Sequence, residues 1–230
     1  MVFQGAMNSL TPVYTIGKQM LETLREHKEM SDKEAQDLME EYLGYVGLPP
    51  EVLNRYPHEL SGGMKQRVVI ASGLFLKPKL VILDEPTTAL DVIVQAQIIN
   101  LLKELKQKFK LSFIFITHDL SLEAEISDRI CVMYAGKIIE YGSVDEVFYE
   151  PAHPYTWALL SSMPDLDTKE KLEAIPGVPP NMIFPPKGDA FAQRNKYAME
   201  IDFEEEPPMF EIPPTHRSEE HQSELQSHRD

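Results

Sequence analysis

The chain has 230 residues, of which 43% are apolar, and a formal net charge of −15 at pH 7. This length predicts one or two domains, and the apolar share supports a packed core. The acidic excess argues against a nucleic-acid-binding surface, because such a surface needs clustered Lys and Arg. No apolar run approaches the roughly 18–20 residues of a membrane-spanning helix, and no signal peptide is visible. Any membrane association is therefore expected to be made through a partner.

The single cysteine, Cys131, excludes an internal disulfide and indicates a reducing compartment. It lies in the apolar run 130–133, so we expect it in the core. A core position predicts an unreactive thiol.

The first part of the chain predicts a strand end followed by helices. Residues 1–4, Met-Val-Phe-Gln, are expected to end a buried strand, and a loop follows to residue 12. Apolar residues then recur at helical spacing from 13 to 57, where Ser31 and Glu34 form a plausible capping box. This segment is predicted to be a small helical bundle packed on a sheet.

Residues 60–67 read Leu-Ser-Gly-Gly-Met-Lys-Gln-Arg and precede an apolar helical run. Ser61 is predicted to cap that helix, and Gly62 and Gly63 leave backbone N–H groups of its first turn uncovered. Uncovered donors and the positive end of the helix dipole together favour an anion. Taken alone, Ser-Gly-Gly is more often an ordinary turn, so this interpretation depends on the rest of the chain.

Two apolar runs further along each end in ionisable residues. Residues 80–83 predict a strand buried on both faces, and Asp84 and Glu85 follow at its carboxyl end. Residues 111–116 predict a second buried strand, shortly followed by His118. Ligands of α/β sheets bind at the carboxyl ends of the strands, so the acid pair, the histidine and the anion site suggest a nucleoside triphosphate with Mg²⁺. Taken alone, one acid could cap a loop and the histidine could be structural.

The remaining pattern alternates strands and helices and then becomes irregular. We expect helices over 91–109, 120–126 and 144–149, and a hairpin of strands 129–134 and 137–141 that turns at Ala135-Gly136. Alternating β and α units predict a parallel sheet core. From residue 150 onward prolines punctuate a sequence with little periodicity, which predicts a loop-rich tail packed on the core.

These motifs resemble those of ATP-binding cassette (ABC) proteins in order and spacing. Residues 60–67 resemble the signature motif, residues 80–85 the Walker B strand with its following glutamate, and residues 89–91 the D-loop. His118 resembles the switch histidine, and Gln4 matches the glutamine of the Q-loop. The resemblance implies an α/β fold, namely an incomplete RecA-like P-loop NTPase sheet core with an inserted α-helical subdomain and a loop-rich C-terminal extension.

The resemblance also implies ATP and Mg²⁺ as cofactors and a role for each residue near them. Asp84 would hold Mg²⁺, through a water, and Gln4 would reach the Mg²⁺ and the attacking water. Glu85 would orient this water as general base, and we expect the proximity of two carboxylates to raise one pKa of the pair. His118 would contact the terminal phosphate.

The signature residues would act on a second subunit. The resemblance implies that Ser61, Gly62, Gly63 and Gln66 contact nucleotide bound to that subunit, with Asp91 at the interface. The implied partners are this second ATPase subunit, identical or different, transmembrane permease subunits and, indirectly, an extracytoplasmic solute-binding protein, with no nucleic acid. The implied location is peripheral, at the cytoplasmic face of the cell membrane.

The family's phosphate-binding loop, Gly-x-x-x-x-Gly-Lys-Ser/Thr, does not occur in these 230 residues. The amides of that loop hold the phosphates, its lysine meets the terminal phosphates and its hydroxyl binds Mg²⁺. We therefore expect an N-terminally truncated chain that does not hydrolyse ATP on its own.

Residues 150–156 and 175–180 resemble the C-terminal extension of oligopeptide and dipeptide importer ATPases, which nickel importers share. Many members carry cysteines in this extension, thought to hold an iron–sulphur cluster, and the matching positions here are Asp189, Asn195 and Asp202. A cluster needs thiolates, so no iron–sulphur cluster is expected.

The sequence thus predicts the ATP-hydrolysing subunit of a peptide importer, present as a fragment that is inactive alone. Its segments are expected to be a Q-loop strand (1–12), a helical subdomain (13–76), a RecA-like core (77–149), the importer extension (150–216) and a tail (217–230). The tail resembles translated sequencing-adapter sequence and is expected to be disordered. The alternatives are the same motor in a nickel importer, a non-enzymatic fragment docking on a permease, and a soluble cassette protein acting on nucleic acid or ribosomes.

Overall fold

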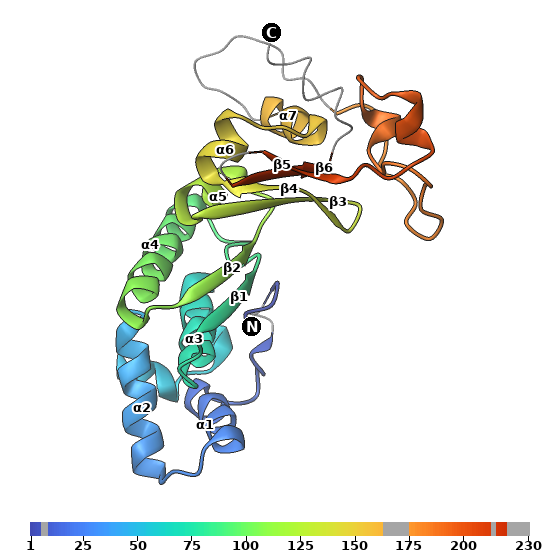
Figure 1. Ribbon diagram of the computed structural model, residues 1–230. Coiled ribbons are helices and arrows are strands. Elements are labelled where there is room, and N and C mark those ends of the chain that lie inside the picture. The colour runs from blue at the N-terminus through green and yellow to red at the C-terminus, as the bar shows by residue number, and fades with distance from the viewer. Residues whose placement is uncertain (6–8, 163–174, 213–214, 220–230) are drawn as a thin grey trace. The chain divides into compact units, whose positions relative to one another are not determined.

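The computed structural model describes residues 1–5, 9–162, 175–212 and 215–219. By its internal contacts the chain divides into two compact units, Met1–Ile126 and Ser127–Asp230 (Figure 1). Each unit has an apolar cluster of its own. The boundary falls inside the segment 77–149, so the division into five segments stays a prediction.

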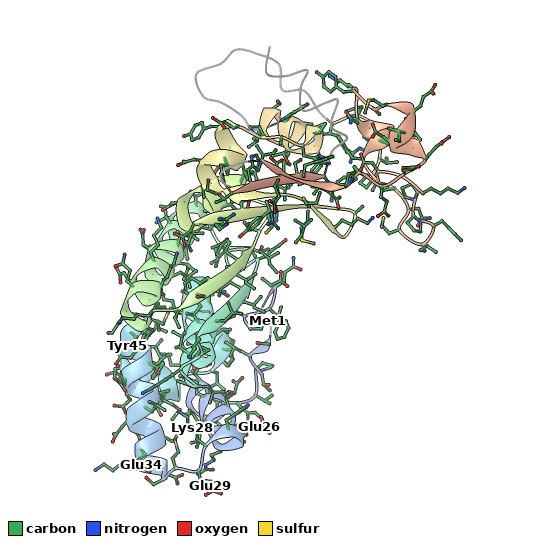
Figure 2. The ribbon with its side chains drawn as sticks, in the orientation of Figure 1. Met1, Glu26, Lys28, Glu29, Glu34 and Tyr45 are labelled. Atoms are coloured by element: carbon green, nitrogen blue, oxygen red, sulfur yellow. The ribbon has the colours of Figure 1, made fainter. Side chains whose placement is uncertain are left out.

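The first two helices of unit 1 are each capped by the side chain of the residue that precedes them. Thr15 Oγ1 accepts the N–H of Lys18 at the start of the first helix, and Ser31 and Glu34 form the predicted capping box at the start of the second. Glu34 lies at the same end of the unit as Lys28 and Glu29 (Figure 2). The elements are α1 (Ile16–His27), α2 (Asp32–Tyr45), η2 (Pro50–Asn54), η3 (Pro57–Glu59) and α3 (Gly62–Leu74).

The rest of unit 1 is built around a pair of parallel strands. Strand β1 (Leu80–Asp84) pairs with β2 (Ser112–Ile116), and Val2 forms a parallel bridge to Leu83 on the other side of β1. The connecting helices are α4 (Val92–Phe109), which Asp91 caps, and α5 (Leu120–Ile126). The predicted parallel sheet and the predicted helices are confirmed.

The helical bundle and the sheet share one core. Leu24 of α1, Leu43 of α2, Val68 of α3 and Leu83 of β1 are fully buried in the same cluster. Complete burial of one such side chain contributes roughly 1.5–3 kcal/mol. The core therefore fixes the helices against the strands that carry the acid pair.

Two predictions of strand burial were wrong in part. Strand β1, predicted to be buried on both faces, exposes Leu80 (49%). Strand β2, predicted to be buried, exposes one of its faces. Phe113 and Phe115 pack against the core, but Ile114 and Ile116 on the opposite face are 47% and 45% exposed. The physical reason is that side chains of a strand alternate between two faces, and within unit 1 the described core covers only one of them.

Unit 2 is built on an antiparallel sheet with the strand order β3-β4-β6-β5. Ala135 and Gly136 both have positive φ, as a two-residue hairpin turn between β3 and β4 requires. The strands are β3 (Arg129–Tyr134), β4 (Lys137–Ser143), β5 (Met209–Ile212) and β6 (His216–Glu219). The helical elements are α6 (Val144–Tyr149), α7 (Pro154–Ser161), η4 (Ala192–Arg194) and η5 (Glu200–Phe203).

Three features of unit 2 differ from the sequence predictions. The extension contains α7, β5 and β6 in addition to loops, and Arg217–Glu219 belongs to β6, so the expected disorder was wrong for those residues. The rest of the expected tail lies outside the described residues. Cys131 is exposed rather than in the core, because alternation along β3 buries Ile130 and Val132 instead.

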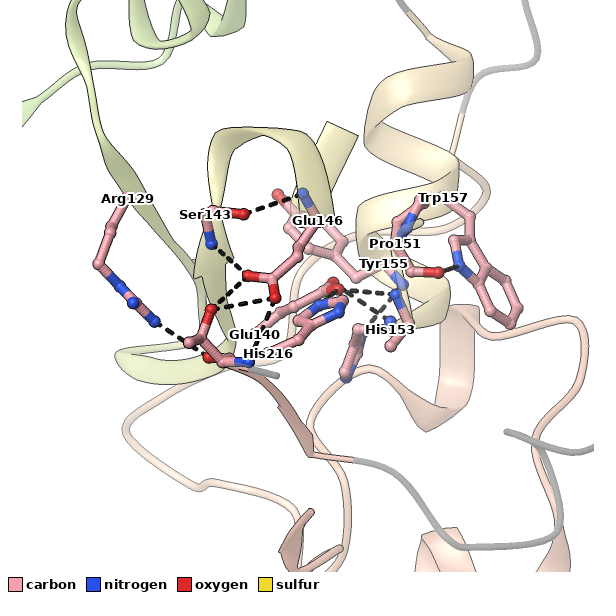
Figure 3. Close-up of polar contacts among 11 residues, drawn as sticks. Arg129, Glu140, Ser143, Glu146, Pro151, His153, Tyr155, Trp157 and His216 are labelled. Carbon is pink, nitrogen blue, oxygen red and sulfur yellow. Dashed lines mark hydrogen bonds and ion pairs between the residues drawn. The ribbon is translucent and has the colours of Figure 1, made fainter. Parts of the chain in front are cut away.

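A buried carboxylate joins three parts of unit 2 (Figure 3). Glu140 of β4 is fully buried and accepts the backbone N–H groups of Ala152 (2.7 Å) and His153 (3.2 Å). The Nε2 atom of His216 in β6 lies 2.5 Å from Glu140 Oε1. A buried carboxylate needs such partners to offset its lost hydration, so these contacts hold β6 and the start of α7 on β4.

The buried imidazole of His153 should make the stability of unit 2 depend on pH. Its Nδ1 accepts the N–H of Tyr155 at the start of α7, and burial lowers the pKa of His153 from 6.5 to about 3. Between about pH 3 and pH 6.5, His153 is therefore protonated in the unfolded chain but neutral in the folded chain. We expect the free energy of unfolding to fall by up to about 1.4 kcal/mol per pH unit below 6.5.

The variant His153→Asn tests this prediction because asparagine can cap the helix but does not titrate. Urea unfolding followed by the fluorescence of Trp157, the single tryptophan, should show a flatter pH dependence between about pH 5 and 6.5 in the variant. Identical slopes for the two proteins would contradict the assignment.

Candidate functional site

The sheet edge of unit 1 brings together residues that are far apart in the sequence. The N–H of Glu85, just after β1, donates to the carbonyl of Ile116 at the end of β2 (2.8 Å). The N–H of Asp84 donates to the carbonyl of Val2 (2.9 Å), so the first residues of the chain are held against the same edge. Gln4 and Glu85 consequently lie at the ends of adjacent strands.

Side-chain contacts bring three of the predicted site residues together there. Gln4 Nε2 donates to Glu85 Oε2 (2.8 Å), and His118 Nδ1 lies 3.2 Å from Glu85 Oε1. Thr88 Oγ1 also donates to Glu85 Oε2 (2.8 Å). We call Gln4, Glu85, Thr88 and His118 the carboxylate cluster. Asp84 is half-buried at the end of β1, beside it in the chain.

Thr88 is a further residue of the site that was not among the predicted ones. Its hydroxyl reaches back three residues to the carboxylate of Glu85, a local bond typical of threonine in turns. The signal in the sequence was therefore the hydroxyl residue at this spacing after the acid pair.

The environment of Glu85 shifts its pKa in the opposite direction to the prediction. We expected the neighbouring carboxylates to raise one pKa of the pair. Instead, hydrogen bonds from Thr88 and then from His118 lower the pKa of Glu85 below its ordinary value. Donors to a carboxylate stabilise its ionised form, so Glu85 is ionised at neutral pH, as an acceptor of protons must be.

The backbone at Glu85 adopts a conformation that side chains disfavour. Its φ is +44°, and Ala89 in the following turn has a φ of +64°. Left-handed backbone at residues other than glycine is uncommon and concentrates at functional sites. Here the turn aims the Glu85 carboxylate back toward Gln4 and His118.

The signature helix presents the tip that the sequence predicted. Ser61 Oγ accepts the N–H of Met64 (3.3 Å) and caps α3, and Ser61 and Gly62 are exposed. A Cβ atom added at Gly63 would lie 2.7 Å from Val94 Cγ1, so the first turn of α3 packs closely on the first turn of α4.

Asp91, the predicted interface residue, caps that neighbouring helix. Its Oδ1 accepts the N–H of Val94 (2.9 Å), and Asp91 itself is exposed. We call Ser61, Gly62, Gly63 and Asp91 the signature tip. Gln66, by contrast, is 2% exposed and lies inside the unit. No hydrogen bond joins the signature tip to the carboxylate cluster within the part of unit 1 that the structure describes.

Gln4 of the carboxylate cluster and the adjacent Asp84 have donors that suit a hard divalent cation. Mg²⁺ prefers oxygen ligands, takes few of them from the protein and keeps several waters. Gln4 donates through Nε2, which leaves its Oε1 as an acceptor, and Asp84 adds a carboxylate. No group of three or more His, Cys, Asp or Glu side chains suited to a metal occurs among the described residues. Gln4 and Asp84 would hold Mg²⁺ together with nucleotide and water.

Asp189, Asn195 and Asp202 stand where many family members have cysteines. In this chain their side chains make local hydrogen bonds to the backbone. Asp189 and Asn195 each accept, through Oδ1, the backbone N–H two residues further on, both at 2.9 Å. Asp202 is buried and accepts the N–H of Met199 through Oδ2 (2.7 Å). Each side chain thus shapes its own turn of the extension.

Among the described residues, no helix is both long and apolar enough to cross a membrane.

Comparison with known proteins gives two family matches. The ABC transporter family matches residues 1–88, and the family described as the oligopeptide/dipeptide transporter, C-terminal region, matches residues 139–201. Among solved structures, CbiO1 from Clostridium perfringens, described as part of the ABC transporter complex CbiONQ, is 31% identical with a TM-score of 0.58. The match covers 65% of this chain and 58% of that chain.

Curated relatives are more similar in sequence. The oligopeptide transport ATP-binding protein OppD of Bacillus subtilis is 57% identical over 220 residues, which are 94% of this chain and 62% of the relative. The dipeptide transport ATP-binding protein DppD of Lactococcus lactis is 54% identical over 220 residues, 94% of this chain and 63% of the relative. A Brucella ovis protein named as a peptide import ATP-binding protein is 48% identical over 227 residues, 95% of this chain and 67% of the relative.

The fold, the sheet-edge cluster and these matches define an ATP-binding cassette protein with the α/β fold of the class. Within this class, the chain belongs to the family of oligopeptide and dipeptide transport ATP-binding proteins. It spans 62% and 63% of the lengths of the first two relatives.

Proposed function

We propose that this chain is part of the ATP-hydrolysing subunit that powers import of peptides across the cytoplasmic membrane. The observation that carries the proposal is the contact of Gln4 and His118 with the two oxygens of Glu85, at the end of a parallel strand pair. The family of the chain supports the substrate class, because its relatives are named for oligopeptide and dipeptide transport.

Each residue of the site then has a chemical task. Asp84 and Gln4 would hold Mg²⁺, and this ion would neutralise charge on the nucleotide phosphates. Glu85, ionised at neutral pH, orients the attacking water and accepts its proton. His118 is largely exposed at the sheet edge, where it can donate to the terminal phosphate. Thr88 fixes the rotamer of Glu85.

The signature tip serves the nucleotide of a second subunit. Ser61 and Gly62 are exposed on α3, with their backbone donors directed out of the helix end. Asp91 lies beside them because α3 packs on α4 at Gly63. The buried Gln66 supports the tip from within the helix.

We also propose the partners of this subunit and its location in the cell. It pairs with a second ATPase subunit, identical or different, docks on permease subunits and receives substrate indirectly through a solute-binding protein. It lies at the cytoplasmic face of the membrane and uses neither nucleic acid nor an iron–sulphur cluster. The absence of a phosphate-binding loop from these residues leads us to expect no hydrolysis by residues 1–230 alone.

Transport by cells tests the proposed substrate class. In cells that depend on the full-length protein, its loss should abolish uptake of a radiolabelled tripeptide and leave uptake of radioactive nickel unchanged. Loss of nickel uptake with normal peptide uptake would instead support the alternative, the same motor in a nickel importer. Loss of neither would contradict both functions.

A further inference from the structure

Unit 2 contains a cavity of about 130 Å³ between α7 and residues 175–197. Its walls include three aromatic side chains, Trp157, Phe191 and Tyr197. The rings of Trp157 and Tyr197 meet edge to face with their centroids 6.1 Å apart. A cavity of roughly 150 Å³ in another protein admits benzene. The size and the walls therefore suit a single planar apolar group.

The floor of this cavity is a packed aromatic side chain, Phe191. Phe191 is 2% exposed and packs edge-on against Tyr134 and Tyr155, with ring centroids 5.4 and 5.3 Å apart. Such aromatic pairs favour this geometry and add to the packing energy. These contacts hold the ring of Phe191 in one position at the floor of the cavity.

Two cationic residues, Arg194 and Lys196, also line the cavity, and Arg194 has no acidic partner among the described residues. Arg194 donates to the carbonyl of Pro176 (2.7 Å), to the hydroxyl of Tyr134 (3.0 Å) and, weakly, to the carbonyl of Ile175 (3.5 Å). No Asp or Glu lines the cavity, and Arg194 makes no ion pair, within the described part of unit 2.

The neighbouring residue supplies a second donor. Asn195 Oδ1 accepts the N–H of Tyr197 (2.9 Å), which fixes the amide so that Nδ2 is the other terminal atom. Asn195 Nδ2 is buried and has no hydrogen-bond partner. A buried donor without an acceptor costs about 1–3 kcal/mol, a cost that an acceptor on a ligand would remove.

We propose that this cavity binds a small carboxylate with a planar apolar body. Arg194 and Asn195 donate to the carboxylate, and Trp157, Phe191 and Tyr197 contact the body. The proposal assigns unit 2 a binding site separate from the carboxylate cluster, and it does not depend on the proposed transport function.

Phenylacetate is a suitable probe, and phenylacetamide is its neutral match. Trp157 is the single tryptophan of the chain, so its fluorescence reports directly on the cavity wall. We expect a saturable change with phenylacetate and an affinity at least about tenfold lower for phenylacetamide, because charge-assisted hydrogen bonds are the stronger ones. Equal affinities, or no saturation up to about 10 mM phenylacetate, would overturn the proposal.

The variant Asn195→Asp removes the buried donor and keeps the acceptor for Tyr197. It should weaken phenylacetate binding at least about tenfold and change phenylacetamide binding less. Asn181→Asp is the matched control, because Asn181 Oδ1 makes the same kind of turn bond to Ile183 (3.0 Å) but lies outside the cavity lining. Equal losses of phenylacetate affinity in the two variants would contradict the proposed site. If Asn195→Asp does not fold, the comparison of phenylacetate with phenylacetamide on the wild-type protein still tests the proposal.

Discussion

Replacing Glu85 by glutamine is expected to stop ATP turnover in a full-length chain that includes a phosphate-binding loop. The substitution keeps the shape of the side chain and its contacts to Gln4 and Thr88 but removes the ionised oxygen that accepts a proton. General-base catalysis contributes typically about 10²–10⁴-fold, so turnover should fall by this factor. Phosphate release at saturating ATP measures it.

The same variant should still form ATP-dependent dimers, because nucleotide binding does not need the base. Light scattering with and without ATP measures this second property. Glu26→Gln, which changes an exposed carboxylate on α1, is the control and should retain wild-type turnover. If Glu85→Gln hydrolyses ATP within about twofold of wild type, Glu85 is not the base.

The second large effect is expected from Gly188→Ala in unit 2. A Cβ atom at this position would lie 2.1 Å from the carbonyl oxygen of Asp202 and 2.8 Å from the carbonyl carbon of Phe203. Both contacts are with backbone, so no flexible side chain can move aside. The adjacent hydrogen bond from Asp189 N–H to Asp202 O (2.7 Å) should break, and unfolding should become easier by about 3 kcal/mol.

Gly44→Ala is the matched control, and we expect it to raise the free energy of unfolding rather than lower it. Gly44 lies within α2 with nothing within 4 Å of an added Cβ, so alanine should stabilise unit 1 by about 0.5–1 kcal/mol through its higher helix propensity. Urea unfolding followed by circular dichroism and by Trp157 fluorescence measures both variants. An unchanged midpoint for Gly188→Ala would show that the two backbone segments do not approach as described.

Local signals in the sequence were sufficient for most of unit 1. Ser31, Ser61 and Asp91 each cap a helix within three residues, so pattern and spacing located those ends. The meeting of Gln4 with Glu85 was also predictable, because the carboxyl ends of adjacent parallel strands converge. The resemblance to ABC proteins then supplied roles that the spacing alone left open.

Unit 2 was less predictable because its main contacts are distant in sequence. His216 reaches Glu140 across 76 positions, and β6 gains its place by pairing with β4 and β5 rather than from its own composition. The polar sequence of β6 gave no alternating pattern to find. Likewise, the pKa of Glu85 depends on Thr88 and His118, whose contacts outweigh the proximity of Asp84 that the sequence shows.

The most direct test of the two-subunit site is an experimental structure of the ATP-bound, Mg²⁺-containing assembly of the full-length Glu85→Gln protein. The proposal requires each terminal phosphate bound near position 85 and His118 to be contacted by a signature serine from a different polypeptide. Ser61 of this chain should in turn contact nucleotide held by the partner. The account is contradicted if Ser61 and His118 of the same polypeptide reach one phosphate, or if His118 lies away from the nucleotide.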